Sequence, residues 1–268
     1  MARKMLVVLM VLASITLIVA GCTGSLTGSV KEEGTPAAGE PAKEAFSWAC
    51  SGQYRPFNFY DEKNNLTGFD VEIGRALCEK MGMEPKPVTA PWDSLINGLQ
   101  AKRYDAILGS MTITEERKQQ VDFSDPYYVS GAQLFVRKEE TGIKSAADLK
   151  QDTKIGVLTN STYDKEARKY SKNIVNYQSD ETALRDLNAG RVDAVITDRF
   201  VGKLAIDETG LKNIEMVGDL LFVEEVGIAF RKGDDALREK VNAALKAIKD
   251  DGTYLKISNK YFGQDISK

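Results

Sequence analysis

The chain has 268 residues, which is enough for one large or two modest domains. Hydrophobic residues make up 43% and charged residues 28%, as in an ordinary soluble protein with a buried core. The formal net charge of -3 provides no basic surface, so we expect no nucleic-acid partner. The absence of His excludes histidine-dependent triads and histidine metal sites, and Cys at 22, 50 and 78 lacks the spacing of a zinc site. We therefore expect neither a metal nor a cofactor.

Residues 1–22 have the pattern of an export signal. A positively charged start precedes an apolar run, residues 5–19, which ends in small residues and Cys22. The run is short for a membrane span of roughly 20 residues, and small residues followed by Cys are the wrong flank for one. The last four residues, Val-Ala-Gly-Cys, resemble a bacterial lipobox. This resemblance implies cleavage before Cys22 and a lipid anchor on it, which places the protein in the cell envelope outside the cytoplasm.

Residues 23–45 are rich in Gly, Ser, Thr, Pro, Ala and Glu, with almost no large apolar side chain. Such a segment cannot bury enough surface to offset the ordering of its backbone, so we expect a flexible tether. Beyond the tether, short apolar runs alternate with segments of helical periodicity. This alternation predicts βα units and an α/β fold with a parallel or mixed sheet.

The predicted elements follow in chain order. Apolar residues recur at helical spacing from Phe69 to Met81, before Gly82, and a second helix is expected after Pro91. Later elements comprise strands and helices in alternation: strands at 105–108, 154–158, 174–177 and 226–230, a helix starting at Ser161 and Thr162, a helix capped by Asp180 and running to Ala189, and a helix striped by Leu237, Val241, Leu245 and Ile248.

Two octapeptides, 99–106 and 187–194, resemble each other and suggest that both halves of the chain share a helix–turn–strand plan. Chance similarity in a common turn explains this echo equally well. Ligands of such sheets bind beyond the carboxyl ends of strands. The residues that follow the two strands, Ser110 and Asp198, are therefore candidate site residues.

Residues 110–128 place hydroxyls and a guanidinium where a strand is followed by a helix. Arg117 offers a planar fork that matches a carboxylate, and free N–H groups at a helix start add a positive field. An ordinary helix start explains the same residues, with Thr112 and Glu115 as a capping box and Arg117 as a surface charge.

This segment nevertheless resembles the ligand-gripping stretch of the periplasmic amino-acid-binding proteins of ABC importers, the polar amino-acid family 3. The resemblance runs from Phe46 to the C-terminus through motifs at 54–57, 66–73, 156–162 and 193–198, and looks closest to the cystine-binding branch. It implies a two-lobed periplasmic-binding-protein fold of type II, each lobe a mixed sheet flanked by helices. The implied lobes are residues 46–128 with 227–268 and residues 134–221, with hinge strands near 129–133 and 222–226.

The resemblance also implies the roles of the site residues. Arg117 pairs with the α-carboxylate of an amino acid, helped by Thr112 and by the helix start at Ser161 and Thr162. Asp198 takes the α-ammonium with Ser110, and Tyr54 and Trp92 form aromatic walls. Trp92 also begins an apolar helical stripe, so a role in the core is the alternative. The expected ligand-binding set is Ser51, Tyr54, Trp92, Ser110, Thr112, Arg117, Ser161, Thr162 and Asp198.

Three features depart from the family pattern or stay open. Ser51 stands where members selective for basic side chains commonly carry Asp, which predicts that cystine or another neutral polar amino acid binds better than lysine or arginine. Cation–π contacts on the aromatic walls are the opposing possibility. Asn160 replaces the usual Gly. Cys50 and Cys78 are compatible with a disulfide and with two buried thiols.

The sequence thus predicts a monomeric, lipid-anchored receptor that captures an α-amino acid and delivers it to the permease subunits of an ABC importer, and not an enzyme. One alternative is a receptor for arginine or lysine. Another is a lyase of the same fold, similar to cyclohexadienyl dehydratase, for which Glu224 and Glu225 are the candidate acids. A sensor domain would need a second membrane span and a cytoplasmic region, and neither is expected here.

Overall fold

The computed structural model describes residues 43–208 and 210–268. Cys22, the expected signal peptide and most of the expected tether lie outside these residues. Within the described part of the chain, no helix has the length and apolar character needed to cross a membrane.

One long sheet runs through the described chain. Its strand order is β10-β9-β11-β8-β12-β6-β1-β5, with β7 paired to β12. A separate sheet of three strands has the order β2-β3-β4. The strands are β1 (Ala45–Cys50), β2 (Gln53–Tyr54), β3 (Asn58–Tyr60), β4 (Leu66–Thr67), β5 (Glu84–Thr89), β6 (Ala106–Thr112), β7 (Val121–Phe123), β8 (Tyr128–Arg137), β9 (Ile155–Leu158), β10 (Ile174–Tyr177), β11 (Ala194–Asp198) and β12 (Ile214–Arg231).

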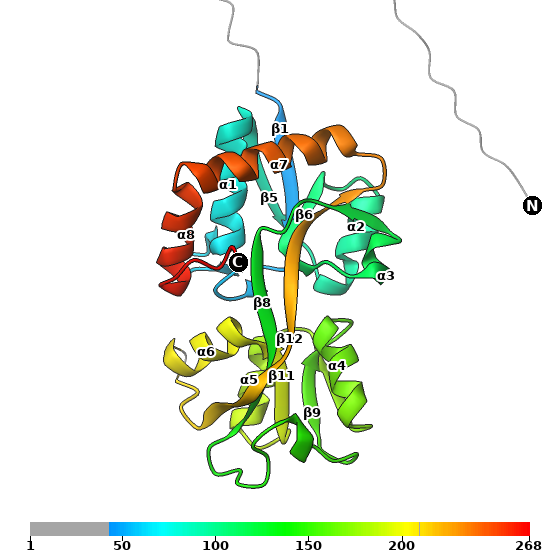
Figure 1. Cartoon of the computed structure of the whole chain (residues 1–268), viewed down its shortest axis with the longest axis vertical. Helices are drawn as coiled ribbons and strands as arrows, with labels where there is room; N and C mark the ends of the chain where they lie inside the picture. Colours follow the sequence, from blue (N-terminus) through cyan, green and yellow to red (C-terminus); the bar gives the residue numbers. More distant parts are fainter. Residues whose placement is uncertain (1–42, 209) are drawn as a thin grey trace, which may run out of the picture. The chain divides into compact units, whose positions relative to one another are not determined.

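Helices divide this sheet into two lobes (Figure 1). Around the first lobe lie α1 (Phe69–Met81), η1 (Trp92–Ser94), α2 (Leu95–Gln100), α3 (Glu115–Lys118), α7 (Asp235–Asp250) and α8 (Thr253–Phe262). The second lobe carries η2 (Ala146–Asp148), α4 (Thr162–Tyr170), α5 (Asp180–Asn188) and α6 (Arg199–Glu208). The last two helices return to pack on α1, so the chain leaves the first lobe, builds the second and comes back.

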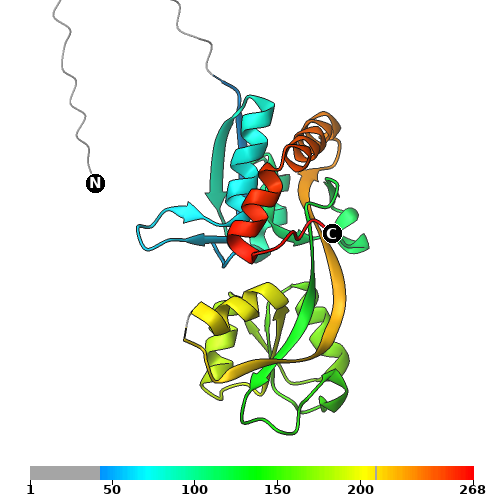
Figure 2. The same cartoon turned by 60° about the vertical axis from the view of Figure 1, so that its left-hand side comes forward.

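Two long antiparallel strands, β8 and β12, connect the lobes (Figure 2). The segments expected to be hinges, 129–133 and 222–226, lie side by side in this ladder, where Ala132 pairs with Phe222 and Val129 with Glu225. The register is irregular between Val217 and Phe222, next to this stretch. The hinge function of the two segments stays a prediction.

Most predicted elements are confirmed. The helix expected from Phe69 is α1, and Gly82 ends it in the left-handed conformation, which a residue without Cβ adopts at no steric cost. The strand expected at 174–177 is β10, and the striped C-terminal helix is α7, which buries Val241, Leu245 and Ile248.

Two predicted helix caps are wrong by one or two positions. The N-cap of α5 is Ser179, whose hydroxyl accepts from the N–H of Thr182, while Asp180 is already helical. The N-cap of α3 is Thr114, not Thr112, because Thr112 still belongs to strand β6. A cap must directly precede the first helical residue, and both segments contain neighbouring residues of the capping type.

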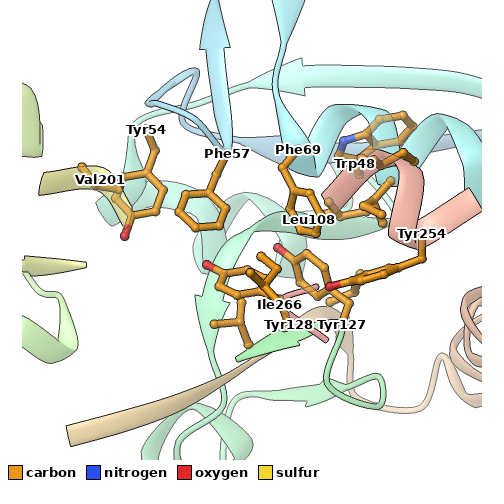
Figure 3. Close-up of a cluster of buried hydrophobic side chains, with 14 of the residues drawn as sticks. Trp48, Tyr54, Phe57, Phe69, Leu108, Tyr127, Tyr128, Val201, Tyr254 and Ile266 are labelled. Carbon is orange, nitrogen blue, oxygen red and sulfur yellow. The ribbon is translucent and has the colours of Figure 1, made fainter. Parts of the chain in front are cut away.

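The core contains an aromatic cluster that reaches the space between the lobes (Figure 3). The Phe57 ring stacks on Tyr54 and on Tyr128, with centroid distances of 5.2 and 4.8 Å. These stacked rings join Tyr54 to the interior of the first lobe and fix its orientation. Cys50 and Cys78 are both buried and free, so the structure contains thiols and not a disulfide at these positions.

Candidate functional site

A pocket lies between the two lobes, and the space left free between its side chains is about 20 Å³, which is room for about one water molecule. The pocket brings together eight of the nine side chains expected from sequence: Ser51, Tyr54, Trp92, Ser110, Thr112, Arg117, Ser161 and Thr162. The ninth, Asp198, is fully buried and does not line the pocket in this state.

Seven further residues line the same pocket and were missed by the sequence analysis: Gln53, Gly109, Leu158, Tyr163, Gln178, Ser179 and Asp180. The last three directly follow strand β10, and Leu158 ends strand β9. The rule that ligands bind beyond the carboxyl ends of strands, which pointed to Ser110, would also have found them. Only two charged residues are among the lining residues, Arg117 from the first lobe and Asp180 from the second.

Arg117 lies on the short helix α3 and is held at two points. Its Nη1 donates to the carbonyl of Thr112 at 2.8 Å, and its Cζ lies 5.3 Å from the centroid of the Trp92 ring. Burial lowers the pKa of Arg117, while the charge of Glu224 raises it, so the guanidinium stays cationic. Trp92 is half-buried against the core and also lines the pocket, so its position fits both roles, and contact with a ligand stays a prediction.

A buried hydrogen-bond network fixes the first-lobe wall of the pocket. Asp70 accepts from the amide of Asn58 at 2.7 Å and from the hydroxyls of Ser110 at 2.9 Å and Tyr127 at 2.7 Å. The Oδ1 of Asn58 in turn accepts from the Ser51 hydroxyl at 3.0 Å. Both Ser hydroxyls are therefore used as donors within the protein, and only their lone pairs remain available to a ligand.

Ser110 also has an unusual backbone, with a φ of 59°. This left-handed conformation is strained for a residue with a Cβ. The N–H of Ser110 donates to the Tyr127 hydroxyl at 3.1 Å, and this bond together with the one to Asp70 holds the residue in place. Burial raises the pKa of Asp70 to about 6, although its three hydrogen bonds act in the opposite direction.

The second-lobe wall begins at the start of α4. Ser161 caps this helix: its hydroxyl accepts from the N–H of Asp164 at 3.1 Å and donates to the carbonyl of Leu158 at 2.6 Å. Asn160, which departs from the family's Gly, has a φ of 55°. Asn tolerates this left-handed conformation better than other residues with a Cβ, so the turn into the helix is preserved.

Glu224, on β12, joins hydroxyls from both lobes. Its Oε2 accepts from Thr112 at 2.7 Å and from Thr162 at 3.2 Å, and its Oε1 accepts from Tyr163 at 2.5 Å. The side chain is 4% exposed. Glu225, the other acid considered from sequence, is exposed and borders a separate hollow beside Ile113. Of the two acids, only Glu224 therefore contacts side chains that line the pocket.

Two more carboxylates are buried in the second lobe, close enough to Tyr54 to affect its titration. The Asp198 Oδ1 accepts from the N–H groups of Phe200 at 2.7 Å and Val201 at 3.2 Å. Its Oδ2 forms no hydrogen bond of ordinary geometry within the described residues, although the Ser130 hydroxyl lies close enough to lower the pKa of Asp198. The Oδ2 of Asp180 has no partner in the same part of the chain. Burial, followed in the case of Asp198 by the charge of Glu224, raises the pKa of Asp198 to about 7 and that of Asp180 to about 6.

Direct contacts hold the lobes against each other around this pocket. The hydroxyls of Tyr54 and Tyr163 lie 3.2 Å apart. On the surface, Glu116 of α3 forms an ion pair with Lys165 of α4. The rings of Phe200 in α6 and Phe262 in α8 lie 4.9 Å apart. The described chain is thus in a closed arrangement.

The comparison with known families decides the identity of this architecture. The sequence profile of the bacterial extracellular solute-binding proteins, family 3, matches residues 46–264. The chain belongs to this family. The match covers both lobes and all nine expected ligand-binding residues, which confirms the resemblance seen in the motifs.

Individual members of family 3 are similar over nearly the whole chain. The L-arginine-binding protein of Pseudomonas aeruginosa is 42% identical over 256 residues, which span 91% of this chain and 96% of that protein. The L-cystine-binding protein TcyJ of Escherichia coli is 35% identical over 246 residues, 91% of this chain and 88% of that protein.

Solved structures confirm the two-lobed fold. An ancestral arginine-binding protein bound to arginine aligns with a TM-score of 0.77 at 37% identity, covering 82% of this chain and 99% of that one. An ancestral amino acid-binding protein described as a precursor of cyclohexadienyl dehydratase aligns with a TM-score of 0.76 at 35% identity, covering 81% and 95%.

Proposed function

We propose that this family 3 protein is the receptor of an ABC importer for an α-amino acid. The observation that carries the proposal is the opposition of charges across one pocket, with the Arg117 guanidinium on the first lobe and bare carboxylate oxygens on the second. A free amino acid needs a cation for its carboxylate and an anion for its ammonium. Both interactions strengthen when the lobes exclude water.

In this proposal the carboxylate end of the ligand is held between the lobes. Arg117 pairs with it, assisted by Thr112 and by the start of α4 at Ser161 and Thr162. The hydroxyls of Thr112 and Thr162 donate to Glu224 in the closed arrangement. An entering carboxylate therefore has to share these two hydroxyl donors with Glu224 or displace it. Glu224 thus competes with the ligand carboxylate for the hydroxyls of Thr112 and Thr162.

The ammonium end is assigned to Asp198 with the lone pairs of Ser110. Asp198 is buried behind the pocket, and its bare Oδ2 is the group that an ammonium would satisfy. Tyr54 and Trp92 then cover the ligand side chain, with Ser51 beside them.

A thermal-shift screen tests the proposal directly. The chain starting at residue 43 is mixed with each proteinogenic amino acid and with cystine. A ligand present at 100 times its Kd adds about 2.7 kcal/mol to the free energy of unfolding, which is readily detected. Absence of any stabilisation at millimolar concentration, checked by calorimetry, would reject an amino-acid receptor.

The proposal includes a monomeric receptor held outside the cytoplasm by lipid on Cys22 and docking on permease subunits. The small-residue pattern before Cys22 supports the anchor. Cys22→Ala is expected to release the protein from the membrane fraction or to leave the signal uncleaved. A Cys22→Ala protein that is cleaved and stays membrane-bound like the wild type would exclude this anchor.

A lyase of the same fold is the second candidate, and the contact of Glu224 with side chains that line the pocket is the observation that favours it. We propose binding without catalysis, because Glu224 is tied by three hydroxyls and the neighbouring groups are those of a carboxylate grip. Incubation with a cyclohexadienyl acid, followed by chromatography, is expected to yield no dehydrated product. Product formation that Glu224→Gln abolishes would establish the enzyme instead.

A further inference from the structure

Asp180 is a charged pocket residue that belongs neither to the proposed carboxylate site nor to the proposed ammonium site. It is 2% exposed, and its Oδ1 accepts from the Thr197 hydroxyl at 2.6 Å. Its Oδ2 is buried and has no partner among the described residues. A buried carboxylate with a bare oxygen is destabilising by several kcal/mol unless a cation or donor compensates it.

Within residues 43–208 and 210–268, no Lys or Arg compensates the charge of Asp180. Arg117 is the only positively charged residue among those lining the pocket, and it lies on the opposite lobe beside Trp92. On the helix of Asp180, the nearest basic residue is Arg185, which pairs with Glu181 on the exposed face. Besides burial, the groups that act on Asp180 are the Thr197 hydroxyl, its own backbone N–H and the charge of Glu224, which is repulsive.

Buried acidic groups outnumber basic groups around the pocket. Asp180, Asp198 and Glu224 are three buried acids, opposed by one guanidinium at Arg117. An ordinary zwitterion adds no net charge, since its carboxylate offsets Arg117 and its ammonium offsets one acid. A ligand with one more cationic nitrogen would compensate a second acid. The raised pKa of Asp180, about 6, agrees with a carboxylate short of positive partners.

We propose that Asp180 is a specificity-determining residue that receives a second cationic nitrogen of the ligand, an amine or a guanidinium beyond the α-ammonium. The proposal rests on the proposed amino-acid receptor and adds the ligand class: arginine, lysine, or cystine through the amine of its second half. Ser51 lacks a charge and its hydroxyl is engaged by Asn58. The counter-charge for the ligand side chain thus comes from the second lobe.

A structural role is the competing explanation. Asp180 is the first residue of α5, where a carboxylate favours the helix dipole, and its bond to Thr197 joins α5 to β11. These contacts account for one oxygen only. Glu181 lies in the same first turn but is exposed, so Glu181→Gln is a matched control for charge at the helix start.

The experiment compares ligands that differ in the second cationic nitrogen. Calorimetric titration of the full chain in detergent uses arginine against citrulline, lysine against norleucine, and cystine against the mixed disulfide of cysteine with 3-mercaptopropionate, which lacks the second amine. We expect the wild type to prefer the member with the second cationic nitrogen in at least one pair by more than about tenfold, as a desolvated charge pair provides. Asp180→Asn should reduce this preference to within about threefold, while Glu181→Gln keeps it.

Thr197→Val separates structure from recognition, because it removes the hydrogen bond and keeps the carboxylate. It should preserve the preference even if the protein melts at a lower temperature. The proposal is overturned if Asp180→Asn retains the preference, if Thr197→Val loses it equally, or if Asp180→Asn weakens charged and uncharged ligands alike, as a general ammonium acceptor would. Equal binding of charged and uncharged members by the wild type also overturns it and leaves the receptor intact. Absence of binding by every amino acid rejects the receptor itself.

Discussion

The first-lobe and second-lobe walls of the pocket differ in how the protein itself compensates their polar groups. On the first lobe, the polar groups of Ser51, Asn58 and Ser110 are connected through Asp70 in one buried network. On the second lobe, Asp180 and Asp198 are buried carboxylates that no basic residue of the described chain pairs with. The first wall therefore presents the cation of Arg117 on a network of protein hydrogen bonds, whereas the second presents negative charge. Closure over a cationic group is thus favoured by the second lobe.

The largest expected effect comes from Arg117, the charged residue on the first-lobe wall of the pocket. Arg117→Ala removes one partner of a desolvated charge pair, which costs about 2–5 kcal/mol of binding free energy. All amino-acid ligands should be weakened alike, as measured by calorimetry. Lys118→Ala is the control, because Lys118 is exposed and pairs with Glu115. Retention of affinity within about threefold in Arg117→Ala would remove Arg117 from the site.

On the second-lobe side, Asp198→Asn should weaken ligand binding and should stabilise the protein measured without ligand. Burial raises the pKa of Asp198 to about 7, above its unfolded value of 3.8. The folded state then binds the proton more tightly, so stability is lost as pH rises from about 4 through 7. Asn cannot ionise and avoids this loss. At pH 8 we expect the ligand-free variant to gain a free energy of unfolding on the order of a few kcal/mol, measured by urea denaturation.

For comparison, Asp186→Asn should change the free energy of unfolding in the opposite direction. Hydrogen bonds from Arg191 and Tyr177 lower the pKa of Asp186, so its stabilising contribution is present above the unfolded pKa and is lost as pH falls. This variant should be less stable than the wild type at pH 8. If Asp198→Asn were destabilised at pH 8 as well, the uncompensated charge assigned to the second wall would be wrong.

A third effect links the two walls through Glu224, whose charge raises the pKa values of Asp198 and Asp180. Wild-type affinity for a ligand should fall as pH decreases from about 7 to below 6, because both acids take up protons that the ligand must displace. Glu224→Gln removes the repulsion and should shift this fall to lower pH. Titrations across this range test the shift, with exposed Glu225→Gln as the control that leaves it unchanged. An identical pH profile for Glu224→Gln would contradict the coupling.

The smallest effect belongs to the surface ion pair between Glu116 and Lys165, which joins the lobes outside the pocket. Both side chains are exposed, and such pairs contribute about 0–1 kcal/mol. Lys165→Gln should change affinity by less than about fivefold, and the difference should vanish at high salt. A larger, salt-independent loss would mean that the closed state depends on this ion pair more than on the buried contacts.

The sequence predicted the elements whose signal is local. Apolar stripes located α1 and α7, and β10 ended where expected. Helix caps were less certain because Ser179 and Asp180 are both capping residues, and only the backbone decides between them. Eight expected site residues line the pocket. They could be predicted because each wall of the pocket is formed by short motifs that lie within one lobe.

What the sequence could not provide arises from contact between the lobes. Glu224 lies 112 residues from Thr112 and 62 from Thr162 along the chain, so no motif contains all three. The bare oxygens of Asp180 and Asp198 depend on what surrounds them after closure, which neither composition nor periodicity encodes. Asp198 is fully buried and does not line the pocket, which the motif that contains it does not reveal.

The placement of the two Trp residues gives the protein an optical reporter of its own occupancy. Trp48 is fully buried in the first lobe, so its fluorescence should stay constant, whereas Trp92 lies at the pocket with the Arg117 cation over its ring. A carboxylate that draws the guanidinium toward itself changes the field on the indole and hence its emission. Stopped-flow mixing can therefore follow ligand entry without a dye, and Trp92→Phe supplies the unresponsive background from Trp48.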